Sequence, residues 1–184
     1  PTDDMETAGE IIFFWVSRMI MLVLYVPGEV PFKNVYLHGL VLDAKGQKMS
    51  KSRGNVINPL DLTDKYGTDA FRMGLIIGNT PGTSLALSED KIKAYKHFVN
   101  KLWNIARFVL SSAEGEVLEK DFELPKVLPQ VLKDLMKDVT EDMENFRFYL
   151  AAEKLYHYAW HTFADVIIED SKKIFKEGSE EEKK

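Results

Sequence analysis

A short polar run near the middle of the N-terminal half carries the clearest chemical signal. Positions 48–52 are Lys-Met-Ser-Lys-Ser, and Gly54 follows two residues later. An ammonium group on a flexible four-carbon stem can follow a phosphate, hydroxyls add donors, and a glycine lets the backbone approach closely. The run therefore predicts a polyphosphate-binding loop, with Lys48 and Lys51 as its charges. The alternative is an ordinary solvated surface loop.

A histidine and a glycine stand just before this loop. His38 and Gly39 follow a β-like run at 35–37, which residues 41–42 could extend. A histidine at a strand end can donate a hydrogen bond to a base or a ribose. From the residues alone, His38 is also explained by a partly exposed side chain that closes a strand.

A very apolar tract precedes both features. Residues 10–25 predict one helix that needs cover on most of its surface, and Trp15 lies within it. Ser17 and Arg18 interrupt the apolar run, which is shorter than the ~20 residues that a bilayer requires. The acidic start lacks the cationic region of a signal peptide. We therefore expect a helix buried in a protein core and no membrane span.

The elements that follow have clear local signals. Asn58 and Pro59 predict a helix start, Gly67 predicts its end, and Thr68 predicts the cap of a second helix over 69–77. From Ser88 the apolar period becomes helical, and it resumes near Pro129 and again over 146–175. On the first of these helices the predicted inner stripe is Ile92, Tyr95, Val99, Leu102, Ala106 and Val109.

These signals predict a mainly α protein with a small α/β part. We expect an α/β unit over 1–80, an up-and-down set of about three helices over 81–178, and a charged, disordered tail at 179–184. Residues 111–127 are expected to connect two helices. The net charge of −5 excludes a general basic surface, so any RNA contact requires local patches.

The cysteine and histidine content limits other chemistry. There is no cysteine, which excludes disulfides and thiolate metal sites and fits a reducing cytoplasm. The four histidines do not form a metal-ligand set, because His157 and His161 have the spacing but lack the acidic neighbour of a zinc-binding helix. No protein-bound metal is expected.

Residues 48–72 resemble the signature loop of class I aminoacyl-tRNA synthetases, in the subgroup that charges valine, isoleucine and leucine. The tract at 7–19 is similar to a valyl-tRNA synthetase segment, although Ala8 and Glu10 replace a glycine and an aspartate of the family. The resemblance implies that this segment ends a Rossmann-like nucleotide-binding domain. It also implies specific sites. Lys48 and Lys51 would act in catalysis, ATP would contact Glu10, His38, Gly39, Lys48, Met49, Ser50 and Lys51, and Trp15 would line the amino-acid pocket.

The helical part carries a second resemblance. Residues 79–83 and 101–108 are similar to the junction and first helix of the anticodon-binding bundle of these enzymes. Aromatic and cationic side chains on this helix could meet tRNA by stacking and phosphate contact: Lys101, Trp103, Asn104 and Arg107. The alternative is that the aromatic residues are core and the cations face water.

The resemblance implies a fragment of a monomeric valine–tRNA ligase that uses ATP, Mg²⁺, valine and tRNA(Val). No segment here matches the other class I signature, a His-x-Gly-His type tetrapeptide, so we expect no valine activation by this chain alone. The alternatives are a fragment of an isoleucyl- or leucyl-tRNA synthetase, a non-catalytic helical RNA-binding module, and a structural scaffold with an accidental loop match.

Overall fold

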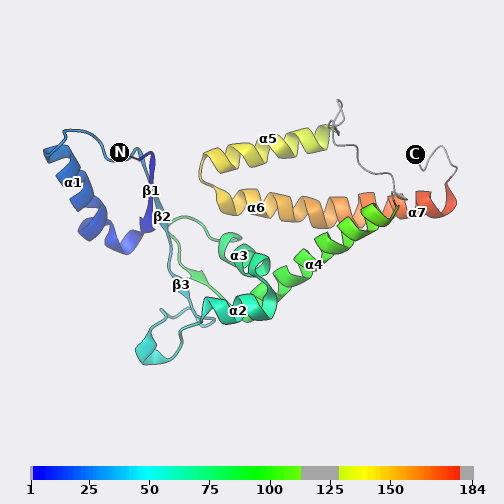
Figure 1. Ribbon diagram of the computed structural model, residues 1–184, viewed down its shortest axis with the longest axis horizontal. Coiled ribbons are helices and arrows are strands. Elements are labelled where there is room, and N and C mark those ends of the chain that lie inside the picture. Colours follow the sequence, from blue (N-terminus) through cyan, green and yellow to red (C-terminus); the bar gives the residue numbers. More distant parts are fainter. Residues whose placement is uncertain (1, 113–128, 179–184) are drawn as a thin grey trace.

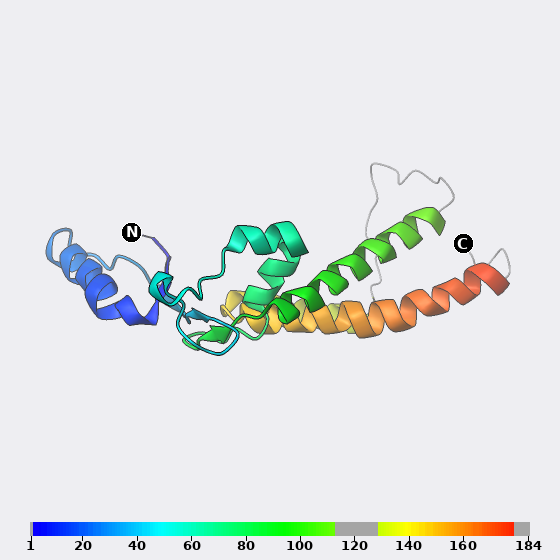
Figure 2. The ribbon, with the colours of Figure 1, turned by 90° about the horizontal axis from the view of Figure 1, so that it is seen from below.

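The computed structural model describes residues 2–112 and 129–178. These residues form an elongated arrangement, with strands and short helices at one end and long helices at the other (Figures 1 and 2). The expected connection at 111–127 lies almost wholly outside the described residues, and so does the expected tail at 179–184. The mainly α architecture with a small α/β part is confirmed.

The N-terminal end is built on two parallel strands. β1 (Asp4–Ala8), which the sequence patterns did not predict, pairs with β2 (Asn34–His38). The register places Glu6 opposite Tyr36 and Ala8 opposite His38. Because side chains alternate along strands, these four residues share one face of the sheet.

The segment between these strands is helical but irregular. A 3₁₀ turn, η1 (Gly9–Ile11), leads into a π-type turn, η2 (Ile12–Val16), and then α1 (Ser17–Tyr25). The expected extent of the helix is confirmed, whereas its expected burial is wrong. Only Val16 is buried in η2 and α1, and Tyr25 is 88% exposed. The reason is that the described residues place no further layer over this apolar surface (Figure 1).

The middle of the chain forms a second small unit. β3 (Val41–Leu42) pairs in parallel with β4 (Leu85–Ala86), and α2 (Pro59–Tyr66) packs against α3 (Thr68–Ile76). Its core gathers four buried residues: Leu62, Ala70, Leu87 and Ile92.

The predicted helix boundaries in this unit are largely confirmed. The Asn58 side chain accepts a hydrogen bond from the backbone N–H of Leu60, and Gly67 ends α2 with a φ of 92°. The predicted cap at Thr68 is wrong. Gly67 already occupies the cap position, so Thr68 is the first residue of α3 and its side chain caps nothing.

Long helices form the remainder. α4 (Glu89–Ser112) lies along a continuous helical run made of α6 (Phe148–His157), η4 (Tyr158–Ile168) and α7 (Glu169–Glu177), and α5 (Gln130–Glu144) packs antiparallel to α6 (Figure 1). The expected up-and-down set of three long helices is confirmed. No helix among the described residues is both long and apolar enough to cross a membrane.

The predicted inner stripe of α4 is correct only at its N-terminal end. Ile92 is buried, but Leu102 and Val109 are exposed. α4 crosses the α6–α7 run at an angle (Figure 2), so the contact passes to a different row of side chains. Phe98 is buried against Tyr156 and Trp160 of the partner run, at ring-centroid distances of 4.6 and 5.9 Å.

Candidate functional site

The base of the polyphosphate-type loop is fixed by one carboxylate and one amide. Asp43 accepts hydrogen bonds from the backbone N–H groups of Lys45 and Gln47 at 2.9 and 2.8 Å. Its other oxygen accepts a hydrogen bond from the side-chain amide nitrogen of Asn55 at 2.9 Å. The side-chain oxygen of Asn55 accepts one from the backbone N–H of Ser50, also at 2.9 Å. The hydrogen bonds from Asn55 and Gln47 lower the pKa of Asp43, so this carboxylate stays ionised.

The tip of the loop is a single tight turn that exposes Lys51 and Arg53. Lys51–Arg53 form the 3₁₀ turn η3, which Ser50 caps by accepting from the backbone N–H of Arg53. Gly54 closes the turn at a φ of 66°, a left-handed conformation that favours glycine. Lys51 and Ser52 are exposed. Among the described residues, Lys51 makes no ion pair.

The apolar N-terminal tract reaches the loop through one ion pair. The Lys48 ammonium lies 3.0 Å from a carboxylate oxygen of Glu10, and both side chains are exposed. An exposed pair of this kind contributes only about 0–1 kcal/mol, so a polyphosphate can displace the carboxylate. The structure thus brings Glu10 and Lys48, two predicted nucleotide contacts, to one place.

His38 lies at the end of β2, on the same face of the β1–β2 sheet as Glu6. Its Nδ1 is 2.9 Å from the carbonyl oxygen of Gly39, and its Nε2 is 3.4 Å from a Glu6 oxygen. Its half-buried side chain fits both the nucleotide contact and the strand-closing alternative.

Gly39 has a structural requirement of its own. A Cβ at this position would lie 1.7 Å from the carbonyl oxygen of Thr83, which crosses beside it. Glycine is therefore needed here for backbone packing, whatever else it contacts.

The aromatic residue assigned to the amino-acid pocket stands apart from these contacts. Trp15 lies on η2, the turn that follows η1, and it is exposed. Neighbouring Phe13 and Phe14 stack edge to face at 5.2 Å and are exposed too. Among the described residues, none encloses these three rings.

The predicted RNA-binding residues separate into two groups. Lys101 is held against the neighbouring helical run, because its ammonium lies 2.5 Å from Asp165 and 4.4 Å from the Trp160 ring centroid. This contact lowers the pKa of Asp165. Trp103, in contrast, is 68% exposed, and Asn104 and Arg107 line a hollow near the C-terminal end of α4 together with Phe108, whose ring packs against Phe175.

Sequence reasoning missed the hydrogen bonds of Asp43 and Asn55 that hold the base of the loop. Asp43 and Asn55 are twelve positions apart, so no local pattern indicates that they pair. An aspartate that opens a turn often accepts from the backbone two residues on, which is the one local signal available. The residues that the structure describes contain no group of three potential metal ligands.

Comparisons with known proteins decide the family. Residues 1–88 match the family described as tRNA synthetases class I (I, L, M and V), and residues 126–184 match the anticodon-binding domain of tRNA ligase. The valine–tRNA ligase of Syntrophotalea carbinolica is 46% identical over 180 residues, which are 94% of this chain and 20% of that protein. The chain belongs to the class I tRNA synthetases. The resemblance seen in the loop is thereby confirmed.

Other relatives agree with this class I assignment. The valine–tRNA ligase of Clostridium acetobutylicum is 42% identical over 92% of this chain and 20% of its own length. The chain therefore spans about a fifth of the length of the curated relatives that it matches.

Solved structures agree in fold. A leucyl enzyme in a ternary complex with tRNA and LeuAMS, from Agrobacterium radiobacter K84, has a TM-score of 0.66 at 24% identity, over 85% of this chain and 23% of that one. The free methionyl-tRNA synthetase of Mycobacterium tuberculosis has a TM-score of 0.71 at 18% identity, over 99% of this chain and 36% of that one.

Proposed function

We propose that this chain supplies the phosphate-binding loop and part of the tRNA-binding helices of a valine–tRNA ligase. The observation that carries the proposal is the loop at 48–54. Its base is fixed by Asp43 and Asn55, while Lys51 projects from its tip without an ion pair among the described residues. A rigid base with a mobile charge suits a ligand whose charge moves during reaction.

The reaction in question is adenylation. The valine carboxylate attacks the α-phosphorus of ATP, the bond to the bridging oxygen breaks, and pyrophosphate leaves with the electron pair. Lys51 and Lys48 would stabilise the charge that grows on the leaving group, once Lys48 has exchanged Glu10 for a phosphate oxygen. Magnesium would accompany ATP, bound in part by the phosphate oxygens of the nucleotide.

The remaining assignments belong to the same proposal. His38, Gly39, Met49 and Ser50 would line the nucleotide side, Glu10 would face the ribose, and Trp15 would contact the valine side chain. The change from loop-bearing unit to helical unit near residue 80 is proposed as the domain boundary. With it we propose a cytoplasmic, monomeric parent.

The tRNA face follows from the placement of the α4 side chains. Trp103, Asn104 and Arg107 are proposed to meet tRNA(Val), since all three are exposed. Lys101 is a weaker candidate because Asp165 already neutralises it.

The choice of valine over isoleucine or leucine is supported by the names of the relatives at 42–46% identity. Sites for these amino acids differ by about a methylene, worth only about 1–3 kcal/mol, so a direct substrate comparison is needed.

The test uses a chimera in which this chain replaces the matching segment of the Syntrophotalea carbinolica enzyme. Valine-dependent exchange of pyrophosphate into ATP is measured, and Lys51→Ala should slow it by about 10²–10³-fold. Lys33→Ala is the matched control, because Lys33 is an exposed lysine paired only with Asp3. Unchanged exchange in Lys51→Ala would refute the loop assignment, and faster exchange with isoleucine or leucine would refute the choice of valine. The isolated chain should show no exchange.

A further inference from the structure

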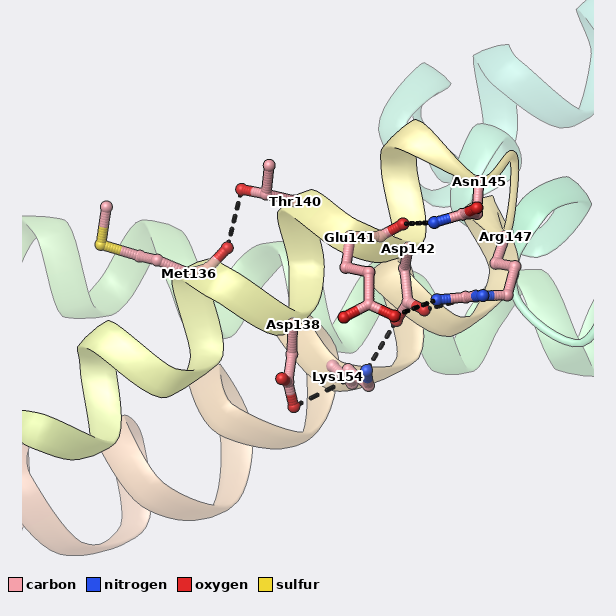
Figure 3. Close-up of polar contacts among 8 residues, drawn as sticks. All are labelled: Met136, Asp138, Thr140, Glu141, Asp142, Asn145, Arg147 and Lys154. Atoms are coloured by element: carbon pink, nitrogen blue, oxygen red, sulfur yellow. Dashed lines mark hydrogen bonds and ion pairs between the residues drawn. The ribbon is translucent and has the colours of Figure 1, made fainter.

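The corner that joins α5 to α6 contains a charge cluster around one buried carboxylate (Figure 3). The Asp142 carboxylate is only 2% exposed. One of its oxygens accepts a hydrogen bond from Arg147 Nε at 2.7 Å, and the other lies 2.7 Å from the Lys154 ammonium. Arg147 also contacts Glu141 at 3.2 Å. A buried carboxylate with two cations is costly to disrupt, so this cluster fixes the corner.

The backbone of the corner is held as firmly. The N–H of Arg147 donates to the carbonyl of Asp142 at 2.8 Å, and the Asn145 side chain donates to the carbonyl of Glu141 at 2.7 Å. Between them, Phe146 has a φ of 57°, the one positive φ of a non-glycine residue in the described ranges. This conformation is unfavourable for a bulky residue, and it persists where the surroundings determine it.

The constrained backbone presents two rings to the N-terminal sheet. Phe146 and Phe148 pack against Tyr36 of β2, with ring centroids at 6.1 and 5.6 Å. Tyr36 shares its sheet face with His38 and Glu6, and the Glu6 carboxylate contacts His38 at 3.4 Å. The corner therefore packs on the sheet face that carries His38, and its contact residue Tyr36 lies two positions before His38.

From this arrangement we propose that the α5–α6 corner is a positioning element of the nucleotide site. Asp142 is a positioning residue that acts through Phe146 and Phe148 on Tyr36, and through β2 on His38. The inference rests on the proposed function only in assigning His38 to the nucleotide. It makes the helical part of the chain a determinant of the geometry at the catalytic end.

The first test is spectroscopic and uses the chain itself. Ring signals of isotope-labelled histidines are followed by NMR in Asp142→Asn and in the matched control Asp138→Asn. Asp138 is 57% exposed and lies 3.8 Å from the same Lys154 ammonium. The His38 signals should move in Asp142→Asn and stay in Asp138→Asn, while those of His97 on α4 stay in both.

A second variant covers the case in which Asp142→Asn does not fold. Phe148→Leu keeps every ion pair of the corner and removes one ring from Tyr36. Movement of the His38 signals in this variant supports the proposal. Unmoved His38 signals in folded Phe148→Leu would overturn it.

The second test measures function in the chimera. A misplaced β2 should raise the KM for ATP by about tenfold in Asp142→Asn, with the KM for valine unchanged and Asp138→Asn like wild type. An unchanged KM for ATP would overturn the proposal. That outcome is distinguishable from failure of the loop assignment, which depends on Lys51→Ala alone.

Discussion

Gly39→Ala should break the contact between the run that joins β2 to β3 and the segment at Thr83 and Ser84 that crosses it. The added Cβ would lie 1.7 Å from the carbonyl oxygen of Thr83, 2.2 Å from its carbonyl carbon and 2.7 Å from the amide nitrogen of Ser84. All three are backbone atoms, so no side-chain rotation relieves the clash, and one of the two segments must move away.

The cost follows from the hydrogen bonds that this movement breaks. The segment after Thr80 donates three backbone hydrogen bonds to the run from β2 to β3: Gly82 to Leu37 at 2.8 Å, Leu85 to Leu40 at 2.8 Å and Leu87 to Leu42 at 3.0 Å. At about 1 kcal/mol net for each bond, their loss lowers the free energy of unfolding by about 3 kcal/mol.

Gly9→Ala is the matched control. A Cβ at Gly9 meets nothing within 4 Å, and its φ is not positive, so its effect should stay within about 0.5 kcal/mol. Urea unfolding gives both free energies, and amide hydrogen exchange at Leu85 and Leu87 reports the local bonds. Equal stability of the two variants, with slow exchange retained at Leu85, would refute the steric argument.

Three further predictions concern the core, a helix cap and pH. Ile92 is fully buried, so Ile92→Ala should lower the free energy of unfolding, measured in urea, by about 2–5 kcal/mol. Ile76→Ala is the control, because Ile76 is 41% exposed and its loss should be far smaller. Equal losses in the two variants would contradict the assigned core. Asn58→Ala removes the cap of α2 and should cost about 1 kcal/mol in thermal unfolding, and no change in Tm would contradict the cap. Hydrogen bonds from Lys154 and then Arg147 lower the pKa of Asp142 below its unfolded value near ~3.9. Its stabilisation is therefore present above that value and is lost as the pH falls through the folded pKa. Asp142→Asn should unfold with a weaker dependence on pH in acid, as measured by urea midpoints, and parallel profiles would contradict this.

Much of the local structure could be predicted from the sequence. The start of α2 at Asn58 and Pro59 and its end at Gly67 are where the residue types placed them. Such boundaries depend on a few neighbouring dihedral angles and one side-chain hydrogen bond, which are properties of the adjacent residues. The loop composition at 48–54 was likewise sufficient to suggest its chemistry.

Local signals failed where long-range packing decides the outcome. The inner stripe of α4 shifted to Phe98 because the crossing angle of two helices is set by their contact, and periodicity on one helix does not contain it. The apolar tract at 10–25 was expected to be buried, but its exposure depends on which other layers are present.

For the candidate site, the sequence by itself determined which charges are available and how the turns that carry them are shaped. Only the tertiary structure decided which charges meet. Glu10 and Lys48 are 38 positions apart, and Lys101 and Asp165 are 64 apart. Residue types at such separations say nothing about distance, because the strand register and the helix crossings bring the partners together. That is why Lys48 pairs with Glu10 beside the loop, whereas Lys101 pairs with Asp165 between two long helices.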